Sequence, residues 1–334
     1  MQKEAMLYEA LENGRVQCNL CAHRCRISPG KHGVCGVRGN DAGVLHTFVY
    51  GKAIAANVDP IEKKPLYHFL PGSYSYSIAT AGCNFRCGFC QNWNISQLSA
   101  KNGDIPGKYL APDHAVDRAV KSECRSIAYT YTEPTVFFEY AFDTAVLAKQ
   151  SGLYNVFVTN GFMTREAIDT IKPYLDAANI DLKSFRDEYY KKYCKGRLTA
   201  VTESIAYMRQ LGIWVEVTTL IIPGENDSDE EMEDIASFIV QVDRDIPWHI
   251  SRFHPDYRFT GHSATPLATM QRARETGMRC GLRYIYLGNV YADSDTRCPG
   301  CGATLIQRSG FSTSDVKITG GRCPSCGTAI AGIW

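Results

Sequence analysis

The feature that most constrains this chain is a run of three cysteines in one short stretch, Cys83-x3-Cys87-x2-Cys90. Gly82 and Gly88 give the backbone there the freedom to wrap around a bulky group. Three thiols this close together are typical of metal ligands. They can bind three irons of a four-iron cluster and leave the fourth iron open to a small molecule. A zinc site is the alternative, although no fourth zinc ligand is obvious nearby.

The N-terminal segment holds a second cysteine cluster, formed by Cys18, Cys21, Cys25 and Cys35, and His23 is a substitute ligand. Four thiolates in so few residues can bind zinc or an auxiliary iron–sulfur cluster, and soft thiolates suit both. Free buried cysteines are a third, plainer interpretation. Cysteine clusters of this kind predict metal sites rather than disulfides, which favours a reducing, cytoplasmic location.

The C-terminal tail carries two C-x2-C knuckles, Cys298 with Cys301 and Cys323 with Cys326. This pattern predicts a four-thiolate metal site, with a zinc ribbon as the first interpretation and a rubredoxin-like iron site as the alternative. A metal would stabilise a tail of about 40 residues that is too small to fold on its own core. The remaining cysteines are expected to be packing residues: Cys124, Cys194 and Cys280.

Length and charge narrow the classes of protein. At 334 residues, 45% of them hydrophobic, the chain can build one large barrel with appendages. A net charge of +1 without a basic block argues against nucleic-acid binding by bulk electrostatics. No apolar run of about 18 residues is present, so no membrane span is expected. Residues 1–13 are mixed polar, lack the pattern of a leader, and are expected to form a helical turn.

From residue 75 onward, strand-like and helix-like patterns alternate. Strands are expected at 76–80, 126–131, 154–159, 177–182, 213–220, 248–253 and 284–290. Helices are expected at 112–124, 136–151, 164–174, 202–210, 227–242 and 265–280. Such alternation predicts an α/β fold with a parallel sheet, and six units suit a partial (β/α)6 TIM-like barrel. A doubly wound open sheet is the alternative, but it would require a glycine-rich phosphate turn after its first strand.

We expect three parts along the chain. Residues 1–70 form a cysteine-rich segment, strand-poor over 18–36, with a hairpin or small sheet at 44–58 and an extended linker at 60–69, in which His68 is structural. Residues 71–291 form the barrel, and residues 292–334 form the zinc-ribbon or rubredoxin-like tail.

In such barrels the working residues follow the C-terminal ends of the strands. The sequence places Glu133 after the second strand, Asn160 after the third, Asp181 and Lys183 at the fourth, and His254 after the sixth. For Asp181 and Lys183, an internal ion pair is the structural alternative.

The cysteine spacing, with Phe89 before the last cysteine, resembles the radical S-adenosylmethionine (SAM) superfamily. The resemblance implies a [4Fe-4S] cluster on Cys83, Cys87 and Cys90 whose open iron binds SAM. An external electron donor then drives cleavage of SAM to a 5′-deoxyadenosyl radical, which abstracts hydrogen from a substrate.

The barrel further resembles the activating enzymes of glycyl radical enzymes, of which pyruvate formate-lyase activating enzyme is the type. The resemblance implies that Glu133 meets the amino group of SAM, although Tyr131 and Thr132 replace two glycines of the family motif. It also implies cofactor contacts elsewhere in the barrel, from Phe89, Asn160, Asp181, Lys183 and His254.

The whole chain resembles the radical enzymes of the AmmeMemoRadiSam system, through the motifs at 33–38, 57–68 and 90–93. That resemblance implies AMMECR-like and Memo-like partners and identifies no substrate. We therefore expect a radical SAM enzyme with an unidentified substrate. The alternatives are a glycyl-radical-enzyme activase and a non-catalytic metal-ribbon binding module.

Overall fold

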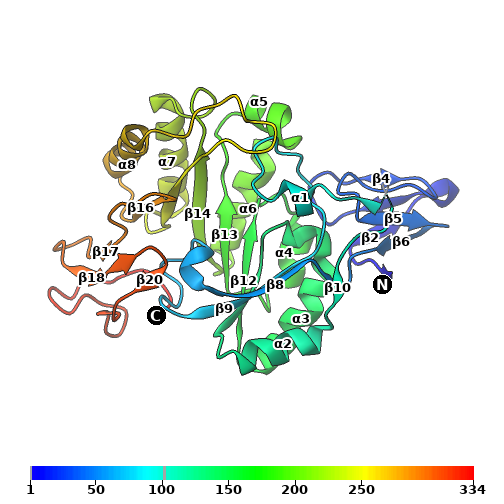
Figure 1. Ribbon diagram of the computed structural model, residues 1–334, viewed down its shortest axis with the longest axis horizontal. Coiled ribbons are helices and arrows are strands. Elements are labelled where there is room, and N and C mark those ends of the chain that lie inside the picture. Colours follow the sequence, from blue (N-terminus) through cyan, green and yellow to red (C-terminus); the bar gives the residue numbers. More distant parts are fainter. Residues whose placement is uncertain (1, 101–102) are drawn as a thin grey trace.

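The computed structural model of the chain describes residues 2–100 and 103–334. Its centre is one eight-stranded sheet (Figure 1). Seven strands are parallel and follow one another in chain order: β9 (Tyr74–Ala79), β11 (Ser126–Tyr129), β12 (Tyr154–Thr159), β13 (Ala177–Asp181), β14 (Trp214–Ile221), β15 (Trp248–Arg252) and β16 (Ile285–Gly288). The eighth strand, β8 (Ala55–Pro60), pairs antiparallel with β9 at one edge. The doubly wound alternative is therefore wrong, because such a sheet reverses its strand order at a switch point.

Six helices connect the parallel strands: α2 (Pro112–Lys121), α3 (Phe138–Gln150), α4 (Arg165–Ile171), α6 (Leu198–Gln210), α7 (Asp229–Asp243) and α8 (Leu267–Cys280). All six were predicted, and α6 begins four residues earlier than expected. Local capping explains several starts: Thr164 accepts a hydrogen bond from Ala167 N at the start of α4, and Ser228 accepts one from Glu231 N at the start of α7. Within the described ranges, no helix has both the length and the apolar character needed to cross a membrane.

The N-terminal segment forms two small antiparallel sheets, and the stretch 18–36 is poor in strands, as expected, with only Cys18 and Arg26–Ile27 in strands. One sheet contains β1 (Lys3–Glu4), β6 (Val44–Thr47) and β5 (Arg38–Asp41); the other contains β2 (Tyr8–Ala10), β3 (Val16–Cys18) and β4 (Arg26–Ile27). The helical turn expected at the N-terminus is replaced by β1, β2 and a short 3-10 turn, Glu12–Gly14. Of the two forms expected at 44–58, the hairpin is wrong and the small sheet is present: β6 pairs with β5 and β1, while β7 (Lys52–Ala53) pairs with β10 (Lys108–Tyr109).

The segment predicted to be an extended linker is buried instead. It begins with a 3-10 turn, Ile61–Lys63, and Leu66 and Phe69 are fully buried. The imidazole of His68 is buried as well, with Nδ1 2.7 Å from Ala331 O and Nε2 2.6 Å from the Tyr286 hydroxyl. These contacts confirm that His68 is structural, and they attach the linker to both the sheet and the tail.

The tail folds into two short hairpins, β17 (Thr296–Arg297) with β18 (Thr304–Ile306) and β19 (Arg308–Ser309) with β20 (Ser312–Thr313). The N-terminal sheets and this tail lie at opposite ends of the long axis of the molecule, blue and red in Figure 1. The central sheet therefore separates two of the three cysteine clusters.

Candidate active site

The C-terminal ends of the parallel strands line a cleft of about 540 Å³, which lies within the usual range of small-molecule sites. The lining includes all but one of the residues expected at this site: Cys83, Cys87, Phe89, Cys90, Glu133, Asn160, Asp181 and Lys183. The exception is His254, which is exposed and stands on the rim, with its ring nitrogens 3.4 Å from Nε2 of Gln91. Parallel strands end at one edge of a sheet, and this brings together residues that are a hundred positions apart in sequence.

The cysteine stretch forms the loop that follows β9. Cys87 is buried and the other two cysteines are half-buried. A hydrogen bond to the Cys194 thiol, together with burial, holds the pKa of Cys87 well above its usual value, and burial raises the pKa of Cys83 and Cys90. Metal binding here must therefore displace thiol protons.

The spacing of these thiols tests the zinc alternative. Four sulfurs around one zinc ion stand about 3.8 Å apart, given Zn–S bonds of about 2.3 Å. In the part of the chain that the structure describes, no three Cys, His, Asp or Glu ligand atoms at this loop lie within 4.8 Å of one another. The thiols instead line one wall of a cleft, an arrangement that fits a larger cluster better than a single ion.

A fourth cysteine at the loop was missed by the sequence analysis. Cys194, expected to be a packing residue, hydrogen bonds to the Cys87 thiol and is fully buried. It ends a π-helical turn, Tyr190–Cys194, that follows α5 (Asp187–Tyr189). Single π-turns are frequent at functional sites, but no local sequence pattern predicts one.

Glu133 is held rigidly at the bottom of the cleft. Its side chain is 1% exposed, and its Oε1 accepts hydrogen bonds from Thr135 N, Thr135 Oγ1 and Thr159 Oγ1 at 3.0, 2.5 and 2.7 Å. Its Oε2 accepts one bond, from Asn160 N at 2.8 Å. Burial raises the pKa of Glu133, although these hydrogen bonds oppose the shift. Because Oε2 has fewer partners than Oε1, it has the greater capacity to accept a hydrogen bond from a ligand cation.

Tyr131, which directly precedes Thr132 and Glu133, has an unusual backbone conformation. Its φ is 62°, in the left-handed region that favours glycine. Tertiary contacts stabilise this conformation: Asn92 Nδ2 donates to Tyr131 O at 2.9 Å, the Tyr131 hydroxyl donates to Asp59, and the Lys64 ammonium lies 4.5 Å from the centre of the ring. The loop therefore keeps a backbone conformation that glycine adopts easily, and it fixes that conformation with a side chain.

Asp181 and Lys183 form the internal ion pair that was the alternative to a cofactor contact, with Lys183 Nζ 2.9 Å from Asp181 Oδ2. Burial disfavours the charged ammonium, but the Asp181 carboxylate and the sulfurs of Cys87 and Cys194 together outweigh this effect, and the pKa of Lys183 lies well above its usual value. The same ammonium lies 5.9 Å from the centre of the Phe89 ring. Both side chains line the cleft, so the two residues form an internal ion pair and also stand where a ligand can contact them.

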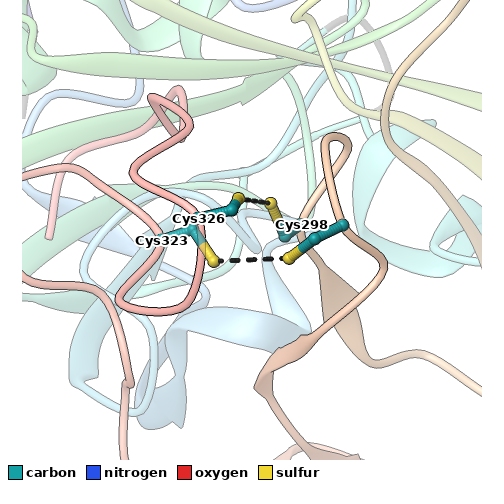
Figure 2. Close-up of side chains that lie close together, drawn as sticks. Cys298, Cys323 and Cys326 are labelled. Atoms are coloured by element: carbon teal, nitrogen blue, oxygen red, sulfur yellow. Dashed lines mark hydrogen bonds between the residues drawn. The ribbon is translucent and has the colours of Figure 1, made fainter.

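The tail cysteines have the geometry of a single-ion site. Cys298 Sγ lies 3.5 Å from Cys326 Sγ, both labelled in Figure 2. Cys301 Sγ lies 3.8 Å from Cys323 Sγ. All four sulfurs lie within 4.8 Å of one another, which suits a tetrahedral ion with bonds of about 2.3 Å. The predicted four-cysteine cluster is therefore present, and it is able to bind a metal ion.

Comparison with known proteins agrees with this site. The family model of the radical SAM superfamily matches residues 77–239, which contain the cysteine loop and the strands β11 to β14. An uncharacterized protein of Methanocaldococcus jannaschii is 43% identical over 333 residues, 98% of each chain. Pyruvate formate-lyase-activating enzyme of Clostridium pasteurianum is 23% identical over 167 residues, 48% of this chain and 67% of that enzyme.

A solved structure shares the fold. SuiB of Streptococcus suis bound to S-adenosylmethionine matches with a TM-score of 0.51 and 12% identity, over 69% of this chain and 53% of SuiB. The family match, the relatives and the shared fold agree with the cysteine loop and its cleft. The chain belongs to the radical SAM superfamily, whose members are SAM-dependent enzymes, and this membership implies a [4Fe-4S] cluster and SAM as cofactors.

Proposed function

We propose that Cys83, Cys87 and Cys90 hold a [4Fe-4S] cluster and that SAM occupies the cleft beside them. The observation that carries this proposal is that one cysteine loop lines the same cleft as polar residues from the next three strands. When it is bound and reduced by an external electron donor, the cluster supplies the electron that cleaves SAM to a 5′-deoxyadenosyl radical. The protein contributes position and exclusion of water.

The residues expected at the cleft each have a proposed partner on SAM. Glu133 accepts hydrogen bonds from the ammonium group through Oε2, because a carboxylate and an ammonium form a charge-assisted pair. Asn160, Asp181 and Lys183 fix the carboxylate and ribose. Phe89 supplies an apolar wall, and His254 faces the adenosyl end from the rim.

The test is anaerobic reconstitution with iron and sulfide, reduction with dithionite and incubation with SAM. We expect 5′-deoxyadenosine from the native protein and none above background from a Cys83→Ala/Cys87→Ala/Cys90→Ala variant. Equal amounts from both proteins would contradict the proposal.

For the substrate, we propose a small molecule or a protein modified together with AMMECR-like and Memo-like partners, as in the AmmeMemoRadiSam system. The motifs at 33–38, 57–68 and 90–93 support this assignment. The check is whether purified partners of these two classes change the rate of SAM cleavage by the reconstituted enzyme. No change with either partner would count against it.

A second candidate is activation of a glycyl radical enzyme. The similarity to pyruvate formate-lyase-activating enzyme favours it. This activity would leave a stable glycyl radical on the partner, detectable by electron paramagnetic resonance (EPR).

For the rest of the fold, we propose that the open sheet forms a partial (β/α)6 barrel and that the tail is a zinc ribbon. A wholly non-catalytic ribbon module does not fit the family.

A further inference from the structure

The N-terminal cysteines surround one small cavity of their own. Cys18 ends β3, Cys21 and Cys25 lie in the turn between β3 and β4, and Cys35 lies in the loop before β5. All four line this cavity together with His23 and Arg38. Cys18 and Cys35 are buried, the other two are half-buried, and all four are free of disulfides. The turns and loops of this segment thus bring four thiols to the wall of one cavity.

The separation of these sulfurs differs from that in the tail. The tail cysteines place four sulfurs within 4.8 Å of one another, as one tetrahedral ion requires. Within residues 2–100 and 103–334, no three ligand atoms of the N-terminal set, His23 included, meet that limit. Four thiols that face a common cavity at wider spacing suit a cluster of several irons with bridging sulfides better than one zinc ion.

Arg38 supplies a second, independent observation. It is 2% exposed, and two of its nitrogens are satisfied: Nη1 lies 2.8 Å from Glu139 Oε1 and Nη2 lies 2.8 Å from Met6 O. Its Nε is buried and has no hydrogen-bond partner among the described residues. An unsatisfied buried donor is unfavourable, and the sulfurs of an anionic cluster in the cavity would be natural acceptors.

The cavity lies beside the loop of Cys83, which lines the active-site cleft. The His23 ring lines the cavity, and its Nε2 lies 2.8 Å from the carbonyl oxygen of Asn84, the residue after Cys83. A Cβ added to Gly82 would lie 2.6 Å from Val37 Cγ1, so the two cysteine loops are in direct contact. A centre bound in the cavity is therefore a near neighbour of the cleft.

We infer that Cys18, Cys21, Cys25 and Cys35 bind an iron–sulfur cluster rather than zinc, close against the radical site. Arg38 donates a hydrogen bond to it, and His23 joins its wall to the loop of Cys83. This site goes beyond the proposed function, which requires only the cleft.

The test uses the full chain with the cleft ligands removed, Cys83→Ala/Cys87→Ala/Cys90→Ala, after anaerobic reconstitution with iron and sulfide. We expect iron and acid-labile sulfide in equal amounts, with about one zinc ion per chain from the tail. Adding Cys18→Ser/Cys21→Ser should remove both iron and sulfide. If that variant fails to fold, the sulfide content of the first variant still shows whether an iron–sulfur cluster is bound. Neither zinc nor a single iron ion in the tail contains sulfide.

Absence of iron and sulfide from the first variant would overturn the inference, whether it holds two zinc ions or none.

A second measurement tests whether the N-terminal cluster lies close to the cluster in the cleft. Reduced native protein should show EPR signals broadened by spin coupling between two clusters, and each single-cluster variant should show a narrow signal. Because the metal content is read without SAM, this result is independent of whether 5′-deoxyadenosine is formed.

Discussion

At the residue scale, the cleft depends on a few side chains whose neighbours fix them before any ligand binds. Glu133 is the clearest case, because its carboxylate is buried and bonded to groups from three positions, Thr135, Thr159 and Asn160. A rigid carboxylate loses little entropy on binding a cation. Its proposed role therefore predicts effects on SAM affinity and on the pH dependence of that affinity.

We expect Glu133→Gln to weaken SAM binding about tenfold or more, since a hydrogen bond to a charged group contributes about 1.5–3 kcal/mol. Equilibrium binding of SAM to reconstituted protein measures this change. Glu231→Gln is the matched control, because that carboxylate is also buried but bonds Ser184 outside the cleft. A similar loss of affinity in both variants would show a general structural effect.

The raised pKa of Glu133 gives a pH dependence with a definite sign. Its carboxylate takes up a proton at a higher pH than an ordinary glutamate, so the anion that pairs with ammonium is lost earlier on acidification. SAM affinity should fall as the pH is lowered toward this raised pKa, and Glu133→Gln should lack that dependence. Parallel profiles for the two proteins would contradict the assignment.

Asp181 and Lys183 call for a double-mutant cycle on SAM affinity. If both contact SAM, Asp181→Asn and Lys183→Met each weaken binding, and the double variant binds most weakly. A purely structural pair would behave differently, because removing both partners leaves no unpaired charge and restores much of the loss. Recovery of affinity in the double variant would therefore reject direct contact.

At the scale of elements, the N-terminal sheets are attached to the α/β core by a buried ion pair. Arg38 on β5 and Glu139 on α3 are 2% and 1% exposed, with Nη1 2.8 Å from Oε1. The Cys21–Met163 bridge and the hydrogen bond from Ala22 N to Phe162 O attach the cysteine turn to the loop after β12. The cysteine-rich segment thus packs on the catalytic edge of the sheet.

We expect Arg38→Met to destabilise the protein by about 3–5 kcal/mol, because it leaves the Glu139 carboxylate buried and unpaired. Arg38→Met/Glu139→Leu should recover most of that loss. Anaerobic thermal unfolding measures both. Arg24→Met is the control: it breaks the exposed pair with Glu166 and should cost no more than about 1 kcal/mol. Equal losses in the two single variants would contradict this account.

At the scale of the whole molecule, the linker and tail together cover part of the central sheet. Tyr67, Tyr284 and Tyr286 share one apolar cluster with residues of the tail, including Leu305 and Ile330. Ile333 also bridges to Phe69, and Arg308 Nη2 donates to Tyr67 O at 2.8 Å. The tail is therefore integrated with the core rather than suspended from it.

Loss of the metal from the tail should consequently destabilise the linker and the neighbouring edge of the sheet as well as the tail. We expect Cys298→Ser/Cys301→Ser to abolish metal binding by the tail and to speed amide hydrogen exchange in residues 60–70 and in β16, as well as in residues 297–334. Cys280→Ser, the same chemical change outside the clusters, should leave exchange unaltered. Faster exchange confined to the tail would contradict this coupling.

The sequence predicted the alternation of seven parallel strands with six helices, because each element is specified by local periodicity and capping. It also predicted the three cysteine clusters from spacing alone, and the polar residues at the strand ends. It missed the N-terminal strands, since strands of two to four residues are stabilised by distant partners such as those of β1 and β6. It missed the place of Cys194 beside Cys87 because a π-turn has no local pattern, and it expected an extended linker where most of residues 61–70 are buried.

What the sequence determined by itself was therefore the chemistry: which residues can bind metal, and which strand ends carry polar groups. Only the tertiary structure decided how far apart the sulfurs of each cluster lie and which charged side chains are buried. It also decided that His254 stands on the rim of the cleft. The reason is physical. Spacing along the chain fixes how many ligands a segment offers, whereas the distances between their atoms depend on packing among segments that are remote in sequence.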